Sequence, residues 1–378
     1  MTIPERLLLG SGPSIIPQRV LDALAQPTIG HLDPAFVEVM EETADLLRYT
    51  FRTENRVALP VSGTGSAGMD AMVCNFVRPG DRVVVGVYGL FGERMSDAMR
   101  RQGAEVVRVE GEWGRALDPQ RLIDAVTPGT AALFVTHGDT STGVTQPLDG
   151  LGDAIHAVDG LFLIDCVTSL SGHALNLDAA GVDAAFSGTQ KCLNVPPGLS
   201  PFTAGERALA RVDGSSRSWY FDLSLVLGYW DGSGGRAYHH TAPINMIYAL
   251  REGLRIVREE GLEERWARHA RAHAALRDAV AVLGLERLPP EGEQLHPLLA
   301  VRVPDGVDEA AVRGALLTED GIEIAGSLGP LAGTVWRIGV MGEGARPEPQ
   351  ERLVNALARR LGGDEAAALG ALRAGWDA

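Results

Sequence analysis

The stretch Arg56-Val57-Ala58-Leu59-Pro60-Val61-Ser62-Gly63-Thr64-Gly65-Ser66-Ala67-Gly68 joins an apolar run to a glycine-rich turn, and a helical pattern then continues to Phe76. Apolar runs and helical stretches keep alternating toward residue 205. Two of these runs, 131–136 and 161–165, are continuously apolar, which is typical of strands buried on both faces. The alternation predicts the α/β class, with a mostly parallel sheet flanked by helices. The other elements expected here are strands over 81–87 and 105–109 and helices over 92–102 and 119–126.

A smaller α+β unit is expected after this sheet. Residues 243–283 have a helical, amphipathic pattern dense in Arg and Glu, which predicts one long helix that bridges two domains. The later elements expected are strands over 297–303 and 334–340, a helix over 349–361 and a helical, Ala-rich tail after Gly362. The expected organisation is an N-terminal segment over 1–17, a large domain over 18–260 and a small C-terminal domain over 261–378.

The composition excludes several classes of partner. The chain has 378 residues, of which 45% are hydrophobic and 22% are charged, as in ordinary globular proteins. Its net charge of −15 opposes binding to nucleic acid or to an anionic membrane surface. The three cysteines lack metal-ligand spacing and suit a reducing compartment. Because there is also no signal peptide and no apolar stretch of about 20 residues, a cytoplasmic protein without a metal site is expected.

Lys191 is the only lysine among the 34 Lys and Arg residues of the chain. Arginine stays charged at any working pH, whereas a buried lysine can lose its proton and attack a carbonyl group. The usual product is a Schiff base, either with a substrate carbonyl or with pyridoxal phosphate. A genome that prefers arginine codons would also explain why arginine is so much more frequent than lysine. The neighbouring motifs therefore have to decide whether Lys191 is catalytic or is left by chance.

The turn 62–68 has the features of a phosphate site. It lies between a strand and a helix, and its small residues let backbone amides approach an anion at the helix N-terminus. It lacks both the Gly-Lys-Ser/Thr ending of a nucleoside-triphosphate loop and the glycine spacing of a dinucleotide site. A single phosphate therefore fits best, and a tight turn without a ligand is the alternative.

Asp165 closes an apolar strand, where ligands of a parallel sheet collect. Its carboxylate could pair with a protonated pyridine nitrogen, or it could simply cap a helix. Lys191 ends the sequence Ser187-Gly188-Thr189-Gln190-Lys191, 26 residues later, which is interpreted as one strand–helix unit further on. Both side chains can then reach the same site.

Arg337 lies in the apolar sequence Val335-Trp336-Arg337-Ile338-Gly339-Val340, so a buried strand position is expected for it. A buried arginine needs an anionic partner. Its guanidinium group could bind a substrate carboxylate in bidentate fashion, or it could form an internal salt bridge. The adjacent His239 and His240 cannot both face one metal from a strand, and a structural role is expected for them.

Together these motifs resemble the class V aminotransferases of pyridoxal-phosphate fold type I, and they are most similar to the alanine–glyoxylate and serine–pyruvate branch. The resemblance runs nearly from end to end and implies that fold, with a mostly parallel large-domain sheet and a smaller C-terminal α+β domain. The matching stretches are 10–14, 30–34, 62–68, 136–143, 164–169, 187–191, 194–198, 238–241 and 337–339.

The resemblance implies pyridoxal 5′-phosphate as cofactor and assigns the residues around it. Lys191 is expected to form the Schiff base and then to move the proton between the substrate Cα and C4′ of the cofactor, while Asp165 pairs with the ring nitrogen. Phe91 stands where the mammalian enzymes have tryptophan, so the stacking surface is smaller. The further cofactor contacts implied are Thr64, Gly65, Ser66 and Gln190 at the phosphate, Phe91 and Val167 on the two ring faces, and Thr140 near the ring oxygen.

The resemblance also implies a homodimer with shared active sites and a small amino acid as substrate. Tyr238 and Thr241 would reach the phosphate of the neighbouring subunit. Arg337 would bind the substrate carboxylate, with the loop around Gly12 nearby.

The activity implied is transfer of the amino group of alanine or serine to glyoxylate or pyruvate in a ping-pong reaction. Relatives that use ureidoglycine, 2-aminoethylphosphonate or pyridoxamine are the first alternatives. Arg337 disfavours the last two donors, and the string Tyr238-His239-His240-Thr241 favours the alanine–glyoxylate branch over the ureidoglycine branch. Cysteine desulfuration and a cofactor-binding regulatory protein without turnover are weaker alternatives, since no cysteine is suitably placed and Arg337 is retained.

Overall fold

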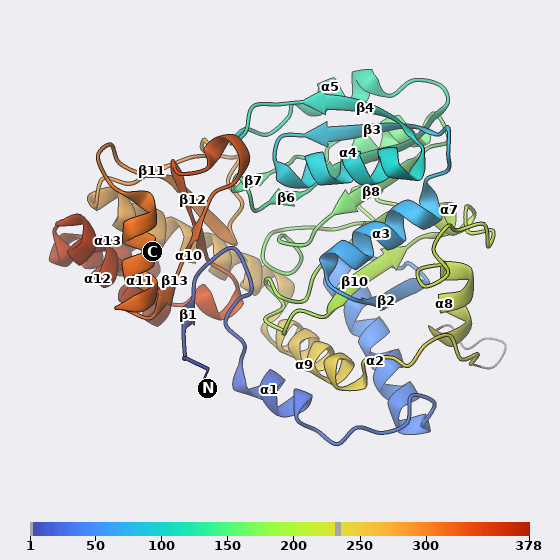
Figure 1. Ribbon diagram of the computed structural model, residues 1–378, viewed down its shortest axis with the longest axis horizontal. Helices are drawn as coiled ribbons and strands as arrows, with labels where there is room; N and C mark the ends of the chain where they lie inside the picture. Colours follow the sequence, from blue (N-terminus) through green and yellow to red (C-terminus); the bar gives the residue numbers. More distant parts are fainter. Residues whose placement is uncertain (1–2, 231–235) are drawn as a thin grey trace.

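A seven-stranded sheet forms the centre of the first part of the chain (Figure 1). The structure is a computed structural model that describes residues 3–230 and 236–378. The strand order is β2-β10-β9-β8-β5-β3-β4. Strand β10 runs antiparallel to both of its neighbours, and all other neighbouring pairs are parallel, so the predicted mostly parallel sheet is confirmed. The strands are β2 (Val57–Ser62), β3 (Arg82–Val87), β4 (Glu105–Glu110), β5 (Thr130–Thr136), β8 (Leu161–Asp165), β9 (Ala184–Phe186) and β10 (Leu199–Ala204).

Both faces of this sheet are buried, as the continuous apolar runs predict. On β8, Phe162 and Ile164 belong to one hydrophobic cluster, whereas Leu161 and Leu163 belong to another, because successive side chains of a strand point to opposite faces. The first cluster is covered by α1 (Gln18–Leu24), α2 (Pro34–Phe51), α5 (Pro119–Ala125), α6 (Leu151–His156) and α9 (Ile244–Glu260). The second is covered by α3 (Gly65–Phe76), α4 (Leu90–Gln102), α7 (Glu206–Leu209) and α8 (Leu223–Trp230).

The C-terminal elements form a separate antiparallel sheet in the order β11-β12-β15-β14, drawn in orange to red in Figure 1. Its own hydrophobic cluster also contains Leu9 from the start of the chain. The N-terminal strand β1 (Leu7–Leu8) pairs in parallel with β13 (Ile322–Glu323), so the chain begins against this C-terminal part. The remaining elements here are α10 (Leu262–Val282), β11 (Glu286–Arg287), β12 (Leu298–Arg302), α11 (Glu309–Thr318), β14 (Ala325–Gly326), η1 (Gly329–Leu331), β15 (Val335–Gly339), η2 (Gly342–Gly344), α12 (Pro347–Leu361) and α13 (Glu365–Asp377).

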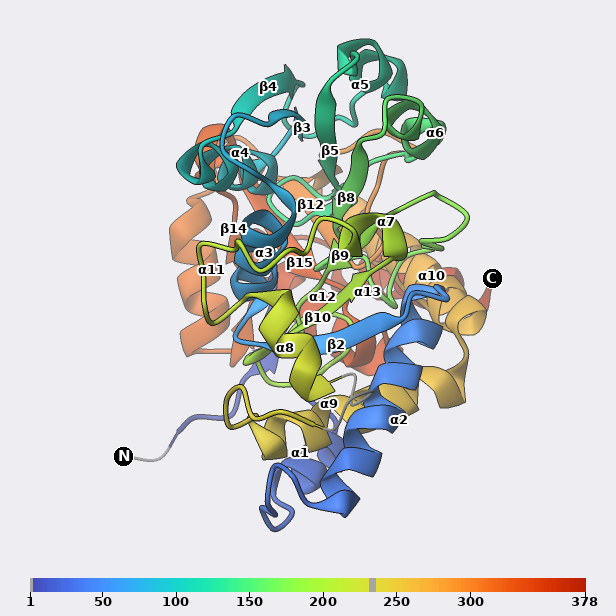
Figure 2. The same cartoon turned by 90° about the vertical axis from the view of Figure 1, so that its right-hand side faces the viewer.

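The prediction of one long helix over 243–283 is wrong. Two helices, α9 and α10, meet at Gly261, whose φ of +83° lies in the left-handed region that favours glycine. Helix α9 packs against α1 and α2, at the bottom of Figures 1 and 2, whereas α10 packs against α12 and α13. The domain boundary between residues 260 and 261 stays a prediction.

The interpretation of Lys191 as one strand–helix unit after Asp165 is also wrong. Residues 166–183, between β8 and β9, form turns and no helix, and Lys191 lies in the turn between β9 and β10. The cause is local, because this stretch is rich in Ser, Thr, Asn, Asp and Gly, which favour turns. Two short strands, β6 (Gly138–Asp139) and β7 (Val144–Thr145), form a hairpin beside it. No helix in the described ranges is long and apolar enough to cross a membrane.

Candidate active site

A cavity of about 270 Å³ lies at the carboxyl edge of the large sheet, beside the ends of β2 and β8. Residues far apart in the sequence line it, and most of the predicted site residues are among them. The predicted residues that the structure brings together here are Thr64, Gly65, Ser66, Phe91, Thr140, Asp165, Val167, Gln190, Lys191 and Arg337.

The phosphate turn connects β2 to α3, as predicted. Thr64 is the N-cap residue of α3, and its side chain makes no capping hydrogen bond. The first N–H groups of a helix have no partner within the helix, so they and the Thr64 hydroxyl can bind an anion. The turn fits tightly, since a Cβ added to Gly65 would lie 3.2 Å from Cγ2 of Val167. Oε1 of Gln190 is buried in the same region without a hydrogen-bond partner among the described residues.

Lys191 places its amine inside the cavity. The residue is only 8% exposed, and its Nζ donates a hydrogen bond to the carbonyl oxygen of Ser11. Gly12 lies against the lysine stem, with a φ of +101°, and an added Cβ there would be 2.7 Å from Nζ. Burial, together with the nearby positive charge of Arg337, lowers the pKa of Lys191 to about 8. The amine is therefore available in its neutral form at mildly alkaline pH.

Asp165 faces the same cavity from the end of β8. Its Oδ1 accepts a hydrogen bond of 2.8 Å from the backbone N–H of Val167. Burial raises the pKa of Asp165 to about 7, and the carboxylate of Asp139 acts in the same direction. A cationic ligand group placed against this carboxylate would restore its charged form.

Arg337 lies on β15 and is 7% exposed. Its Nε donates to the carbonyl oxygen of Gly326 at 2.8 Å and its Nη1 to that of Thr140 at 3.0 Å. No carboxylate of the described residues lies within ion-pair distance of Arg337. Among these residues, therefore, Arg337 does not form the internal salt bridge that was the alternative. A buried guanidinium group that is held only by carbonyl groups can still form an ion pair with the carboxylate of a ligand.

Two further charged residues near the cavity were missed in the sequence. Asp139 is buried and accepts hydrogen bonds from the backbone N–H and hydroxyl groups of Ser141, and its Oδ2 receives the N–H of Phe91 at the start of α4. Arg94 lies one helical turn after Phe91, with its guanidinium carbon 5.2 Å from the centre of that ring. The spacing of three residues on one helix was the available signal for Arg94.

Tyr238 and Thr241 do not line the cavity of their own chain. Their hydroxyl groups lie 3.2 Å apart, and Tyr238 is 61% exposed. The neighbouring His239 and His240 contact each other through their Nδ1 atoms at 2.8 Å, and His240 also contacts the hydroxyl of Ser62. No group of His, Cys, Asp or Glu among residues 3–230 and 236–378 is arranged to hold a metal ion.

The chain is similar to known aminotransferases over almost its whole length. The profile of the family described as aminotransferase class-V matches residues 6–333. The chain is 40% identical over 369 residues to the (S)-ureidoglycine–glyoxylate transaminase of Bacillus subtilis, covering 91% of this chain and 88% of that protein. It is 37% identical over 367 residues to the alanine–glyoxylate aminotransferase of Callithrix jacchus, with 96% and 89% covered.

Solved structures show the same fold. An alanine–glyoxylate aminotransferase from Nostoc sp. matches with a TM-score of 0.92 and 44% identity, over 96% of both chains. A ureidoglycine–glyoxylate aminotransferase from Bacillus subtilis matches with a TM-score of 0.96 and 39% identity, over 100% of both chains. The predicted fold type I architecture is thereby confirmed, and the chain belongs to the class-V aminotransferase family, whose members depend on pyridoxal phosphate.

Proposed function

We propose that this protein is a pyridoxal-phosphate-dependent aminotransferase that moves the amino group of a small amino acid, alanine or serine, to glyoxylate or pyruvate. The observation that carries the proposal is the position of the Lys191 amine. It is buried in one cavity with a carboxylate, Asp165, and with a guanidinium group, Arg337, that has no ion pair among the described residues. These are the groups needed for a cofactor ring nitrogen and a substrate carboxylate.

The residues present fit the cofactor. The free N-terminus of α3 and the Thr64 hydroxyl line the cavity and offer donors to a phosphate. Gln190 also lines the cavity, and its buried side-chain amide oxygen has no partner among the described residues. Phe91 and Val167 line the cavity from different elements and offer two apolar surfaces for a flat ring. Thr140 would lie near the ring oxygen. When bound, pyridoxal phosphate supplies an aldehyde and an electron-withdrawing ring.

The side chains have distinct parts in the proposed reaction. With a pKa near 8, Lys191 can hold and release a proton at Nζ, which suits proton transfer to and from the substrate Cα. Burial raises the pKa of Asp165 to about 7, so a cation that faces it would extend its ionised form to lower pH, and this pairing would favour a protonated ring nitrogen. Arg337 would hold the substrate carboxylate and thereby orient the Cα toward the lysine.

The donor is the finer part of the proposal. Arg337 favours a donor with an α-carboxylate, which supports alanine and serine over 2-aminoethylphosphonate and pyridoxamine. Ureidoglycine also carries an α-carboxylate, and the 40% identity to a ureidoglycine–glyoxylate transaminase makes it the second candidate. Glyoxylate as acceptor is supported by the names of both sets of relatives.

A homodimer with shared active sites is part of the same proposal. Tyr238 is largely exposed, and neither it nor Thr241 lines the cavity of its own chain. Such hydroxyl groups are available to donate to a phosphate bound by a second copy. Sedimentation of the holoenzyme would give the assembly state.

The test is a matrix of amino donors against glyoxylate and pyruvate. Adding the correct donor without acceptor should lower the visible absorbance of the bound cofactor, and adding the acceptor should restore it. The Lys191→Ala variant should lose turnover by about 1000-fold or more, because no other lysine can replace the amine. Lys191→Arg, which keeps the charge but cannot release a proton, is the matched control and should be equally inactive.

Three results would count against the proposal. If Lys191→Ala turned over substrate at the wild-type rate, Lys191 would not take part in the reaction. A preference for ureidoglycine over alanine and serine would select the second candidate. Failure of every donor to change the cofactor absorbance would favour a binding protein without turnover.

A further inference from the structure

The turn that carries Lys191 is fixed from behind by Asn194. The N–H of Asn194 donates to the carbonyl oxygen of Lys191 at 3.1 Å, and its φ of +54° is unusual for a residue with a side chain. The hydroxyl of Ser14 donates to the same carbonyl oxygen at 2.6 Å. The amide Nδ2 of Asn194 in turn donates to Oγ of Ser14 at 3.0 Å and to the carbonyl oxygen of Ile15 at 2.8 Å. The lysine turn is thus joined to the N-terminal segment that contacts its amine.

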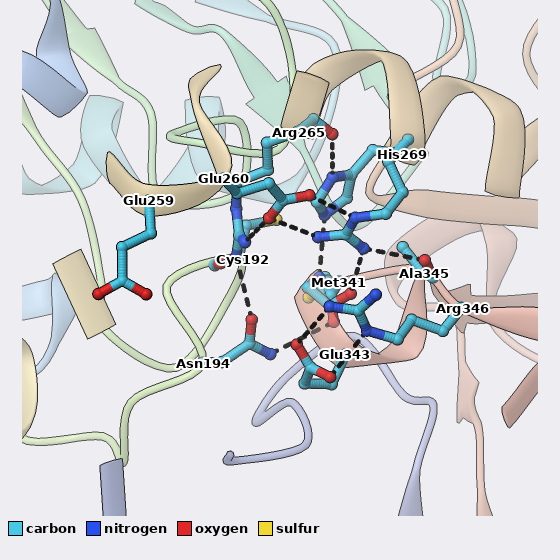
Figure 3. A network of polar contacts seen from close by, with 12 residues as sticks. Cys192, Asn194, Glu259, Glu260, Arg265, His269, Met341, Glu343, Ala345 and Arg346 are labelled. Carbon is cyan, nitrogen blue, oxygen red and sulfur yellow. Dashed lines mark hydrogen bonds and ion pairs between the residues drawn. The ribbon is translucent and has the colours of Figure 1, made fainter. Parts of the chain in front are cut away.

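A buried arginine holds the other side of this turn. Arg265, on α10, is 1% exposed, and its Nη2 donates to the carbonyl oxygen of Cys192 and, at 3.3 Å, to Oδ1 of Asn194. Its Nη1 contacts the carboxylate of Glu260 at 2.5 Å (Figure 3). A guanidinium group that is buried to this degree needs a counter-charge, so Glu260 keeps Arg265 in place.

The same carboxylate links the lysine turn to the segment behind Arg337. Glu260 also pairs with Arg268 at 2.5 Å, and Nη1 of Arg268 donates to the carbonyl oxygens of Gly342 at 2.7 Å and Ala345 at 2.9 Å. His269 accepts the N–H of Gly342 at 2.9 Å. This segment directly follows β15, which carries Arg337.

We propose that Arg265, held by Glu260, is a positioning residue that fixes the Lys191 turn and couples it, through Arg268, to the strand that carries Arg337. The proposal rests on the proposed function, since it assigns the network to the reacting amine and the substrate anchor of that reaction. Glu260, Arg265 and Arg268 are not among the residues that line the cavity, so they act through the backbone groups they hold. A purely stabilising role is the competing explanation.

The lone lysine makes the position of the amine measurable without substrate. Trace acetylation of the full-length, cofactor-free chain at a series of pH values, followed by mass spectrometry of the Lys191 peptide, gives the pH midpoint of that amine alone. Loosening of the turn exposes the amine to water, and the midpoint then rises from about 8 toward the ordinary lysine value.

Two substitutions test the network. Arg265→Met removes a positive charge and Glu260→Gln removes a negative charge, so a direct charge effect would move the Lys191 midpoint in opposite directions. Displacement of the turn raises it in both, and we expect a rise of about one pH unit. In the holoenzyme, kcat should fall about tenfold and the KM of the donor should change less, because Arg337 keeps its own hydrogen bonds to the carbonyl groups of Gly326 and Thr140. Arg277→Met, which removes a partly exposed arginine of the same helix, is the matched control and should leave both readouts unchanged.

The outcomes separate this proposal from the proposed function. If both variants lose thermal stability but keep the wild-type Lys191 midpoint, the network only stabilises the fold and the proposal is overturned. Opposite shifts in the two variants would show a charge effect and also overturn it. If Arg265→Met does not fold, Glu260→Gln, which changes no side-chain shape, decides the matter. The acetylation result holds even if no donor proves active, in which case only the proposed function fails.

Discussion

At the scale of single residues, the buried carboxyl group of Asp165 serves the proposed reaction but lowers the stability of the folded chain above pH 4. Its pKa in the folded chain, about 7, lies above the ordinary value of 3.8. The folded chain therefore keeps a proton that the unfolded chain releases between these pH values, and stability falls as pH rises from about 4 to 7. Above pH 7 the full difference, about 4 kcal/mol as an upper bound, opposes folding.

Asp165→Asn is expected to stabilise the cofactor-free chain at pH 8 and to inactivate the holoenzyme. The amide keeps the acceptor for the N–H of Val167 but carries no charge, so the cost above disappears. Turnover should fall by about 100-fold or more, because the ring nitrogen loses its counter-charge. Thermal unfolding at pH 8 and at pH 5 checks the sign: the gain should shrink at pH 5, and a lower Tm at pH 8 would contradict the assignment.

The sequence predicts those site residues whose chemistry is unusual for their setting. A single lysine, an aspartate at the end of an apolar strand and an arginine within one are visible without a structure, and the structure brings them to one cavity. Arg265 and Glu260 are not visible in this way. Arg265 donates to a backbone carbonyl group about 70 residues away, and the chain is rich in Arg–Glu pairs that lie on the surface. The contacts assigned to Tyr238 and Thr241 stay predictions, because they involve a second copy.

At the scale of elements, the loop between β15 and α12 fits against the lysine turn with no room to spare. Gly342 has a φ of +53°, and a Cβ added to it would lie only 1.5 Å from Oδ1 of Asn194. Arg265 donates a hydrogen bond to the same oxygen atom. Any side chain at this position must displace either the loop or the turn.

Gly342→Ala should lower the free energy of unfolding by about 3 kcal/mol, from backbone strain together with the clash. Gly333→Ala is the matched control, because Gly333 also has a positive φ, +77°, but nothing lies within 4 Å of an added Cβ. Its loss should be about 1 kcal/mol, from strain alone. Denaturant unfolding of both variants measures the difference, and equal losses would show that the contact with Asn194 does not matter.

The sequence predicts elements well where burial dictates the pattern. The strands over 161–165 and 131–136 are found within a residue of their expected bounds, because both faces of the sheet are apolar. The break between α9 and α10 was missed because the amphipathic pattern continues across Gly261. The glycine itself was the available signal, since glycine is a weak helix former.

At the scale of the whole molecule, a row of four histidines, two buried and two half-buried, crosses between the two sheets. His137 and His173 follow the large sheet, His273 lies on α10, and His296 precedes β12. Their ring centres are 5.9 Å apart for His137 and His173, 4.5 Å for His173 and His296, and 6.0 Å for His296 and His273. Burial lowers the pKa of His137 to about 4 and that of His273 to about 3.

We expect the chain to lose stability as the pH falls below about 6.5. The unfolded chain then binds protons at these histidines that the folded chain excludes, which costs about 3 kcal/mol per residue by pH 4 for groups shifted this far. His273→Phe should reduce the fall in Tm between pH 7 and pH 4.5, because phenylalanine binds no proton in either the folded or the unfolded chain. If the Tm of His273→Phe falls as steeply as that of the wild type, protonation of His273 does not cause the loss of stability.

The pairing of β1 with β13 has a consequence for biosynthesis. Leu7 leaves the ribosome roughly 15–60 s before Ile322 exists, at about 5–20 residues per second. Until then Leu7 and Leu8 have no strand to pair with, and the segment that carries Ser11 is tied to the lysine turn only through Ser14 and Asn194. A nascent chain, or one that ends before β13, therefore lacks one of the two attachments that hold the N-terminal segment beside Lys191.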